Sequence, residues 1–171
     1  FGYKIVKKID KQNLVNNVFN SVASKYDLMN DITSFGIHRE WKNNLINWLA
    51  PQNNQKLADI AGGTGDIANK FLNNGGHSAY VIDINEEMIK SGKINKQSSK
   101  KIKWMVASAE EIPLDENMFE RATMGFGLRN ITNRAKALKE VYRILKPGGR
   151  FVCLEFSHVE NDKIKEIYNF W

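Results

Sequence analysis

The chain has 171 residues, a formal net charge of +6 at pH 7, 42% hydrophobic residues and 26% charged residues. This length and composition are those of one globular domain with a buried core, and they exclude a disordered tail, a collagen-like fibre and a coiled coil. No apolar run approaches the ~18 residues of a membrane-spanning helix, and the first residues, FGYKIVKKID, contain no signal-peptide core. The basic residues do not cluster with interleaved aromatic residues, so no nucleic-acid partner is expected.

The predicted elements begin with helices. Apolar residues at three- and four-residue spacings predict a helix over 11–31 and a second over 38–50. One stripe of the second helix carries Trp41, Leu45, Trp48 and Leu49. After Pro51, short apolar runs alternate with helical stretches. The runs predict strands at 57–61, 79–84, 102–107, 119–126 and 150–156, and the stretches between them predict helices at 66–73, 86–96 and 133–145.

Strands that alternate with helices predict right-handed βαβ units. The runs are apolar throughout, as in strands that are buried on both faces. We therefore expect an α/β fold with a doubly wound, mostly parallel sheet, in which ligands bind beyond the carboxyl ends of the strands. Residues 1–50 are predicted to form a helical lid segment and residues 51–171 the ligand-binding part of the domain. Cys153, in the last apolar run, is expected to be a buried and inert thiol.

A glycine-rich turn, Gly62–Gly65, follows the first predicted strand and opens a helix. Such a turn lets a ligand approach the backbone closely. The pattern Gly-x-Gly-x-x-Ala that starts at Gly63 also fits a dinucleotide site, so a nicotinamide-dependent oxidoreductase is an alternative. Asp59 and Asp66 flank the turn with negative charge, which disfavours a pyrophosphate and favours a ligand with a cationic amino group. A tight turn with two solvated carboxylates is the purely structural alternative.

The next two strands also end in candidate ligand-binding residues. Asp83 ends the second strand, where an acidic side chain can accept hydrogen bonds from two ribose hydroxyls. Alternatively, Asp83 caps the following helix in a capping box with Glu86. After the third strand, the small residues Ser108 and Ala109 leave room for a flat adenine ring and can bond its edge.

The fourth predicted strand ends at Gly125 and continues into Arg129 and Asn130. A buried strand that runs into glycines, an arginine and an asparagine indicates a functional turn. The alternative is a bulged turn with a surface arginine.

Together these segments resemble class I S-adenosylmethionine-dependent methyltransferases, and more closely the UbiE-type C-methyltransferases of ubiquinone and menaquinone biosynthesis. The resemblance covers almost the whole chain. The sequences that carry it are VFNSVASKYDLMND at 18–31, GIHREWK at 36–42, DIAGGTGD at 59–66, DINEEMI at 83–89, GFGLRN at 125–130 and LKPGGRFVCLEFS at 145–157. That family continues into the last strands of a seven-stranded sheet, so we expect this chain, which begins without Met, to be a C-terminally truncated fragment.

The resemblance implies S-adenosylmethionine as the cofactor and no metal site. It places the cofactor at Thr64, at Asp83 and at the pair Ser108–Ala109, in addition to Asp59, the Gly62–Gly65 turn and Gly125. Many relatives carry serine at the position of Gly125, so this chain lacks one possible hydrogen bond there.

The reaction implied by the resemblance is methylation of a ring carbon of a polyprenylated benzoquinol or of demethylmenaquinol. Such a transfer needs the ring carbon about 3–3.5 Å from the methyl group, and it needs a developing phenolate to be stabilised. Arg129 is the candidate cation, since a guanidinium is a poor proton acceptor, and Asn130 is the candidate for orienting a water or the hydroxyl. Tyr26 is a candidate for lining the ring pocket. His38 is a candidate general base, with a surface or packing role as the alternative.

The expected partners are a lipid quinol substrate, the membrane surface that would carry its tail, and a homodimer or a quinone-biosynthesis complex. The expected location is the cytoplasm, either free or peripheral to the inner membrane. Glu155 and His158, at the end of the last predicted strand, lie near the site by topology, but a solvated loop is the favoured interpretation of both. A truncated fold that binds the cofactor without turnover is the non-catalytic alternative.

Overall fold

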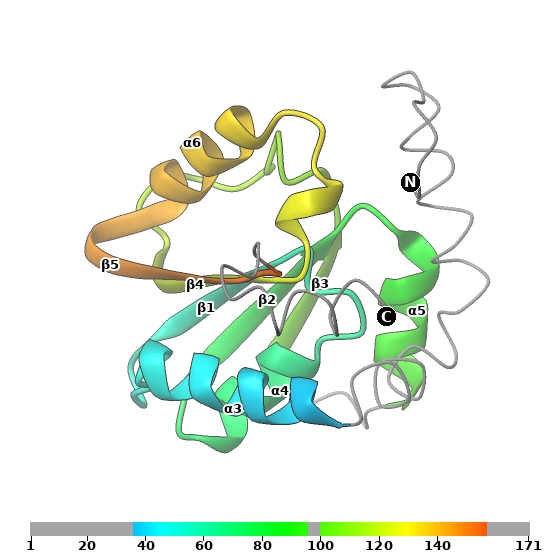
Figure 1. Ribbon diagram of the computed structural model, residues 1–171. Coiled ribbons are helices and arrows are strands. Elements are labelled where there is room, and N and C mark those ends of the chain that lie inside the picture. The colour runs from blue at the N-terminus through cyan, green and yellow to red at the C-terminus, as the bar shows by residue number, and fades with distance from the viewer. Residues whose placement is uncertain (1–35, 96–99, 157–171) are drawn as a thin grey trace, which may run out of the picture.

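The computed structural model describes residues 36–95 and 100–156, which form one parallel sheet with helices on both faces (Figure 1). The strand order is β3-β2-β1-β4-β5. The strands are β1 (Lys56–Ile60), β2 (Ser78–Asp83), β3 (Ile102–Val106), β4 (Phe119–Gly125) and β5 (Leu145–Leu154). The helices are α3 (Ile37–Leu49), α4 (Asp66–Asn73), α5 (Glu86–Asn95), the short 3-10 helix η2 (Leu128–Asn130) and α6 (Arg134–Ile144).

All four neighbouring strand pairs are parallel. The predicted doubly wound α/β sheet is therefore confirmed, and its order reverses between β1 and β4. Most predicted bounds agree with the structure to within one or two residues. The exception is β5, which starts directly after α6: Leu145 pairs with Phe119 and Arg150 with Arg121, so Lys146–Gly149 bulges opposite a single residue.

Two apolar cores lie on opposite faces of the sheet. In Figure 1, α6 covers one face, and α3, α4 and α5 cover the other. Successive β1 side chains alternate between these cores, with Leu57 packed among residues of α3 and α4, and Ala58 among residues of β4 and α6. Because both faces are covered, β1 is apolar throughout, with Asp59 as its only buried acidic residue.

The buried stripe of α3 differs from the predicted one. Leu45 and Leu49 of the predicted stripe are buried, together with His38, Lys42 and Ile46. Trp48 of the same predicted stripe is 70% exposed. The apolar members of this stripe join the core above β1. The division of the chain into a lid, 1–50, and a ligand-binding part, 51–171, stays a prediction, because residues 1–35, including Tyr26 and the predicted helix 11–31, lie outside the described residues.

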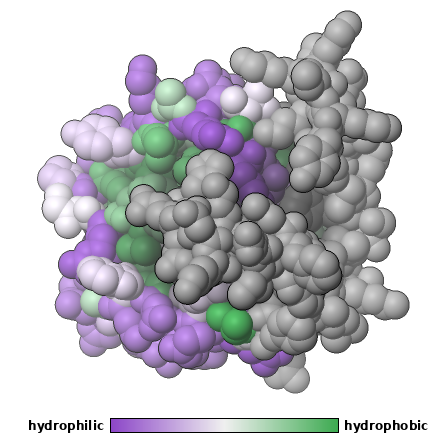
Figure 2. All heavy atoms as spheres, viewed as in Figure 1, coloured by the Kyte–Doolittle hydropathy of each residue, from purple (hydrophilic) through white to green (hydrophobic). Residues whose placement is uncertain are grey.

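β5 lies at one edge of the described sheet. Figure 2 shows apolar residues gathered over this side of the molecule, between polar surfaces. The prediction that Cys153 is buried is wrong, since its thiol is exposed. The reason is the position of β5: within residues 36–95 and 100–156 no further strand covers its outer side. Among these residues, no helix combines the length and the apolar character that crossing a bilayer requires.

Candidate functional site

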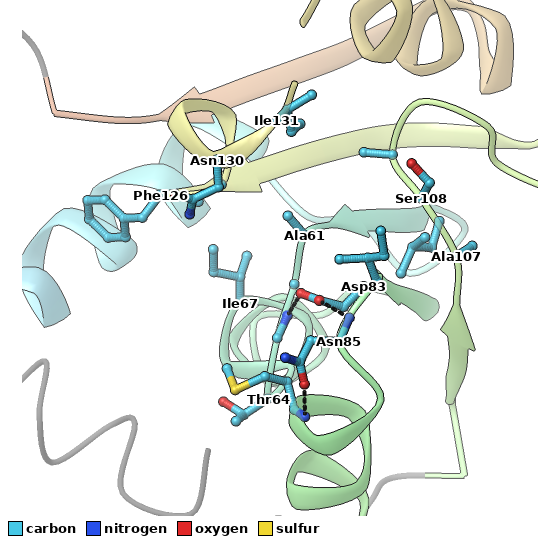
Figure 3. Close-up of a pocket in the computed structure, with 18 of the residues that line it drawn as sticks. Ala61, Thr64, Ile67, Asp83, Asn85, Ala107, Ser108, Phe126, Asn130 and Ile131 are labelled. Atoms are coloured by element: carbon cyan, nitrogen blue, oxygen red, sulfur yellow. Dashed lines mark hydrogen bonds between the residues drawn. The ribbon is translucent and has the colours of Figure 1, made fainter. Parts of the chain in front are cut away.

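A cleft of about 1110 Å³ of empty space, part of it open to solvent, lies at the carboxyl ends of the strands. This is the usual place for a ligand in a doubly wound sheet. The loops after β1, β2, β3 and β4 all contribute to its walls. Figure 3 shows Asp83 and Ser108 on one side of the cavity and Phe126 and Asn130 on the other.

The turn after β1 forms the floor of the cleft. Gly63 has a φ of 53°, a left-handed conformation that glycine adopts without strain, and a Cβ at this position would lie 2.9 Å from Cε of Met88. The amide of Gly63 donates to Oδ2 of Asp83 at 2.8 Å. Gly62, Gly63 and Thr64 line the cleft. The turn is therefore tied to the end of β2, and its backbone is left open to a ligand.

Asp83 is held by backbone amides from two sides. While Oδ2 accepts from Gly63, Oδ1 accepts from the amide of Asn85 at 2.8 Å. Burial raises the pKa of Asp83, and the backbone amides of Asn85, Gly63 and Ile84 oppose this rise. The capping box with Glu86 is wrong, because Asn85 caps α5 by accepting from the Met88 amide at 3.0 Å. A carboxylate has about four acceptor sites, so Asp83 can still accept from hydroxyls of a ligand in the cleft.

Asp59 lies beneath the turn, not in the cleft wall. It is completely buried, and its Oδ2 accepts from the amide of Ala68, in the first turn of α4, at 3.1 Å. Its Oδ1 has no hydrogen-bond partner among the described residues. Burial raises the pKa of Asp59 to about 7, and repulsion from Asp66 and Asp83 adds to the rise. Asp59 thus supports the turn and the start of α4 from below.

Gly65 also lies outside the cleft wall and forms the N-cap of α4, with a φ of 72°. A Cβ there would lie 2.6 Å from the ring of Trp104, so the close approach of helix and strand needs a glycine.

Lys42 is a lining residue that the sequence analysis missed. Its side chain is 6% exposed, and its Nζ donates to Oδ2 of Asp66 at 2.9 Å. It is the only basic residue among those that line the cleft in the described part of the chain. The available signal was a lysine at helical spacing with the buried residues Leu45, Ile46 and Leu49.

The third wall comes from the loop after β3. Ala107, Ser108 and Ala109 line the cleft, and Oγ of Ser108 accepts from the amide of Glu110 at 3.1 Å. Ile131 lies across from this loop (Figure 3). Small side chains on one side and an apolar side chain on the other leave a slot that suits a flat ring.

Gly125 lines the cleft at the end of β4. A Cβ at this position would lie 2.5 Å from Cδ1 of Ile67. Ile67 therefore occupies the space that the side chain of a serine would need.

The turn after β4 separates its two predicted catalytic residues. Asn130 lines the cleft, whereas Arg129 does not. The guanidinium of Arg129 donates to Oε1 of Glu155 at 2.8 Å, and its backbone amide donates to Oε2 of the same carboxylate at 3.0 Å. Glu155, expected only to be near the site, thus holds this turn through two hydrogen bonds.

Three aromatic rings surround this ion pair. Phe126 and Phe156 lie 4.9 Å apart by ring centroids, and Trp41 of α3 contacts both. The guanidinium of Arg129 lies 4.9 Å from the Phe156 centroid and 5.9 Å from the Phe126 centroid. Phe126, with a left-handed φ of 58°, also lines the cleft. This aromatic cluster, Trp41–Phe126–Phe156, therefore reaches the cleft through Phe126.

The structure thus brings together most of the predicted residues. Those that line the cleft are Gly62, Gly63, Thr64, Asp83, Ser108, Ala109, Gly125 and Asn130. Asp59, Gly65 and Arg129 adjoin it, while His38 is buried in the first turn of α3 and does not line it. Tyr26 and His158 lie outside the described residues.

Comparisons with known proteins agree with this geometry. The sequence pattern of the ubiE/COQ5 methyltransferase family matches residues 6–171. The whole chain aligns with the ubiquinone/menaquinone biosynthesis C-methyltransferase UbiE of Ruegeria at 44% identity, and the alignment covers 70% of that protein. It also aligns with the mitochondrial 2-methoxy-6-polyprenyl-1,4-benzoquinol methylase of Dictyostelium discoideum at 45% identity. That alignment covers 99% of this chain and 64% of the methylase. The chain thus spans about two thirds of these relatives. A solved structure of a putative methyltransferase from Bacillus halodurans matches 75% of this chain and 56% of that one, with a TM-score of 0.65 and 26% identity.

Proposed function

The chain belongs to the ubiE/COQ5 methyltransferase family, and on this premise we propose that its cleft binds S-adenosylmethionine. We further propose that the protein transfers the methyl group to a ring carbon of a polyprenylated benzoquinol or of demethylmenaquinol. The observation that carries the proposal is Asp83, which ends β2 at the cleft and is held there by two backbone amides.

The sequence-based prediction of a UbiE-type C-methyltransferase of quinone biosynthesis is confirmed at the level of the family. The nicotinamide-dependent alternative rested on the glycine spacing alone. The acidic residues beside the turn also disfavour a pyrophosphate.

The described residues fit this cofactor. Asp83 supplies carboxylate oxygens for ribose hydroxyls, and the slot between Ala107–Ala109 and Ile131 suits an adenine. Gly62 and Gly63 line the cleft where the amino-acid end would lie, and neither has a side chain to cover its backbone. The bound cofactor would supply an electrophilic methyl group on a sulfonium.

The protein's own contribution to turnover lies at the turn after β4. Asn130 faces the cleft and is placed to orient the ring hydroxyl or a water. Arg129, held by Glu155 beside the ring of Phe126, adds a positive charge next to this position. A positive charge at this position stabilises a developing phenolate.

The proposed substrate has a polyprenyl tail, which would bring the protein to a membrane surface. The net charge of +6 favours anionic lipid headgroups. We accordingly place the protein in the cytoplasm, in peripheral contact with the inner membrane, as a homodimer or within a quinone-biosynthesis complex.

The test is calorimetric titration of the 171-residue chain with S-adenosylhomocysteine and, in parallel, with NADH. We expect S-adenosylhomocysteine to bind with a Kd of about 1–100 μM and NADH not to bind. Binding of NADH alone would overturn the assignment. Transfer of an isotope-labelled methyl group to a short-chain benzoquinol then separates an enzyme from a fold that only binds the cofactor.

A further inference from the structure

The basic side chain in the cleft wall has no role in the function proposed so far. Lys42 comes from α3, outside the strand-end loops that form most of the site. The remaining charged residues that line the cleft within the described part of the chain, Asp66, Asp83 and Glu110, are all acidic.

The ammonium of Lys42 is only partly satisfied by the protein. It is 6% exposed and donates to Asp66 at 2.9 Å. An ammonium has three N–H donors, and among the described residues Asp66 is its one hydrogen-bond partner. A buried charge needs partners for its remaining donors, because removing it from water costs several kcal/mol. Lys42 can therefore donate a further hydrogen bond to an acceptor in the cleft.

The position of Lys42 indicates which part of a ligand would supply that acceptor. Its partner, Asp66, is the first residue of α4 and directly follows the turn that carries Gly62 and Gly63. The positive end of the α4 dipole points to the same region and favours an anionic group there. The amino-acid end of S-adenosylmethionine carries both an ammonium and a carboxylate, whereas its nucleoside carries no anionic group.

Resting on the proposed function, we propose that Lys42 binds the carboxylate at the amino-acid end of the cofactor. Asp66 is the positioning residue, since it fixes the lysine ammonium at the edge of the turn. The acidic residues near the turn then match the cationic part of the ligand, and Lys42 matches its anionic part. Helix α3 thereby contributes a cofactor-binding residue as well as packing.

The test compares two ligands that differ by this one group. Titrations with S-adenosylmethionine and with decarboxylated S-adenosylmethionine, which keeps the amine and the sulfonium, are made on the wild-type chain and on Lys42→Met. We expect the wild type to prefer the carboxylated ligand by at least ~10-fold, as for a hydrogen bond to a charged group. Lys42→Met should remove this preference by weakening the carboxylated ligand alone.

Lys70→Met is the matched control. Lys70 of α4 is half-buried and donates to Asn43 of α3 at 2.9 Å, so it joins the same two helices without lining the cleft. It should change neither affinity. Lys42→Arg, which keeps the charge, should retain part of the preference and guards against a folding defect of the methionine variant.

Each other outcome overturns the proposal. A wild type that binds both ligands equally, or a Lys42→Met variant that weakens both equally, shows that Lys42 only joins α3 to α4. A wild type that binds neither ligand instead rejects the cofactor site, and with it the function proposed above.

Discussion

The two sides of the cleft are built from different chemistry. At the centre of the sheet, carboxylates of β1 and β2 are held by backbone amides, and Asp59 has no exposed surface. At the end of β4, next to the edge of the sheet, aromatic rings surround an ion pair whose Arg129 side chain is 44% exposed. The first side is suited to hold a polar ligand in one fixed geometry. The second presents flat apolar surfaces and one cation, as a quinol ring requires.

This contrast implies that variants should separate binding from turnover. Changes on the central side should weaken the cofactor, whereas changes on the β4 side should slow methyl transfer. The predictions below test that separation, beginning with the largest expected effect.

Arg129→Ala should lower methyl transfer by ~10²–10³-fold, as for the loss of one group that stabilises developing charge. The affinity for S-adenosylhomocysteine should change less than about twofold, because Arg129 does not line the cofactor side of the cleft. The measurements are kcat with a short-chain benzoquinol and calorimetric Kd. Arg129→Lys should be intermediate, since lysine keeps the charge without the planar fork. A large loss of cofactor affinity would contradict the assignment.

Asp83→Ala should weaken cofactor binding by on the order of 10²-fold, because hydrogen bonds to a charged group contribute about 1.5–3 kcal/mol each. Asp83 also accepts a hydrogen bond from the Gly63 amide, so part of the lost affinity would come from the greater freedom of the turn after β1. At saturating cofactor, kcat should fall far less. Titration and initial-rate measurements on the same preparation check both effects. An unchanged Kd with a reduced kcat would reverse the roles of the two sides.

Two glycines with similar backbone angles allow the packing at the centre of the sheet to be compared with the packing at its edge. Gly65 has a φ of 72° and Gly148 has a φ of 77°. A Cβ added at Gly65 would lie 2.6 Å from Trp104, whereas a Cβ added at Gly148 would meet no atom within 4 Å. Both alanine variants should lose about 1 kcal/mol for the left-handed backbone. Gly65→Ala should lose a further ~1–3 kcal/mol from overpacking. Urea unfolding measures the difference, and equal losses would show that Trp104 moves away freely.

A further expected effect is a pH dependence of the free energy of unfolding. The pKa of Asp59 rises from 3.8 to about 7 on folding, so the folded chain keeps a proton that the unfolded chain loses across this range. Stability should therefore fall as the pH rises from about 4 to about 7, by at most ~1.4 kcal/mol per pH unit. Above this window the loss is complete.

Asp59→Asn isolates this contribution, because the amide oxygen can still accept from Ala68. Unfolding free energies of this variant should fall less steeply than those of the wild type between pH 4 and 7. Asp115→Asn, which removes an exposed carboxylate, should follow the wild type. A constant difference between wild type and Asp59→Asn at every pH would show that the burial of Asp59 does not shift its titration.

Much of the fold follows from local pattern. The apolar runs and helical stretches locate β1 to β4 and α4 to within one or two residues, because their period depends only on which faces are buried. β5 starts earlier than expected because Lys146–Gly149 bulges against β4, and this pairing joins residues far apart in the chain. The phase of α3 was missed at Trp48 for a similar reason: several stripes of this helix are apolar, and only packing against the sheet selects one.

The candidate site divides in the same way. The sequence by itself determined the glycine turn, the acidic end of β2, the small residues after β3, the polar turn after β4 and the family. Only the tertiary structure decided that Lys42 enters the cleft wall, that Glu155 holds Arg129, and that Asp59 lies beneath the turn. The pairs Lys42–Asp66 and Arg129–Glu155 join residues 24 and 26 positions apart. Such contacts depend on which faces of α3 and β5 meet the sheet, which the local periodicity of a sequence does not encode.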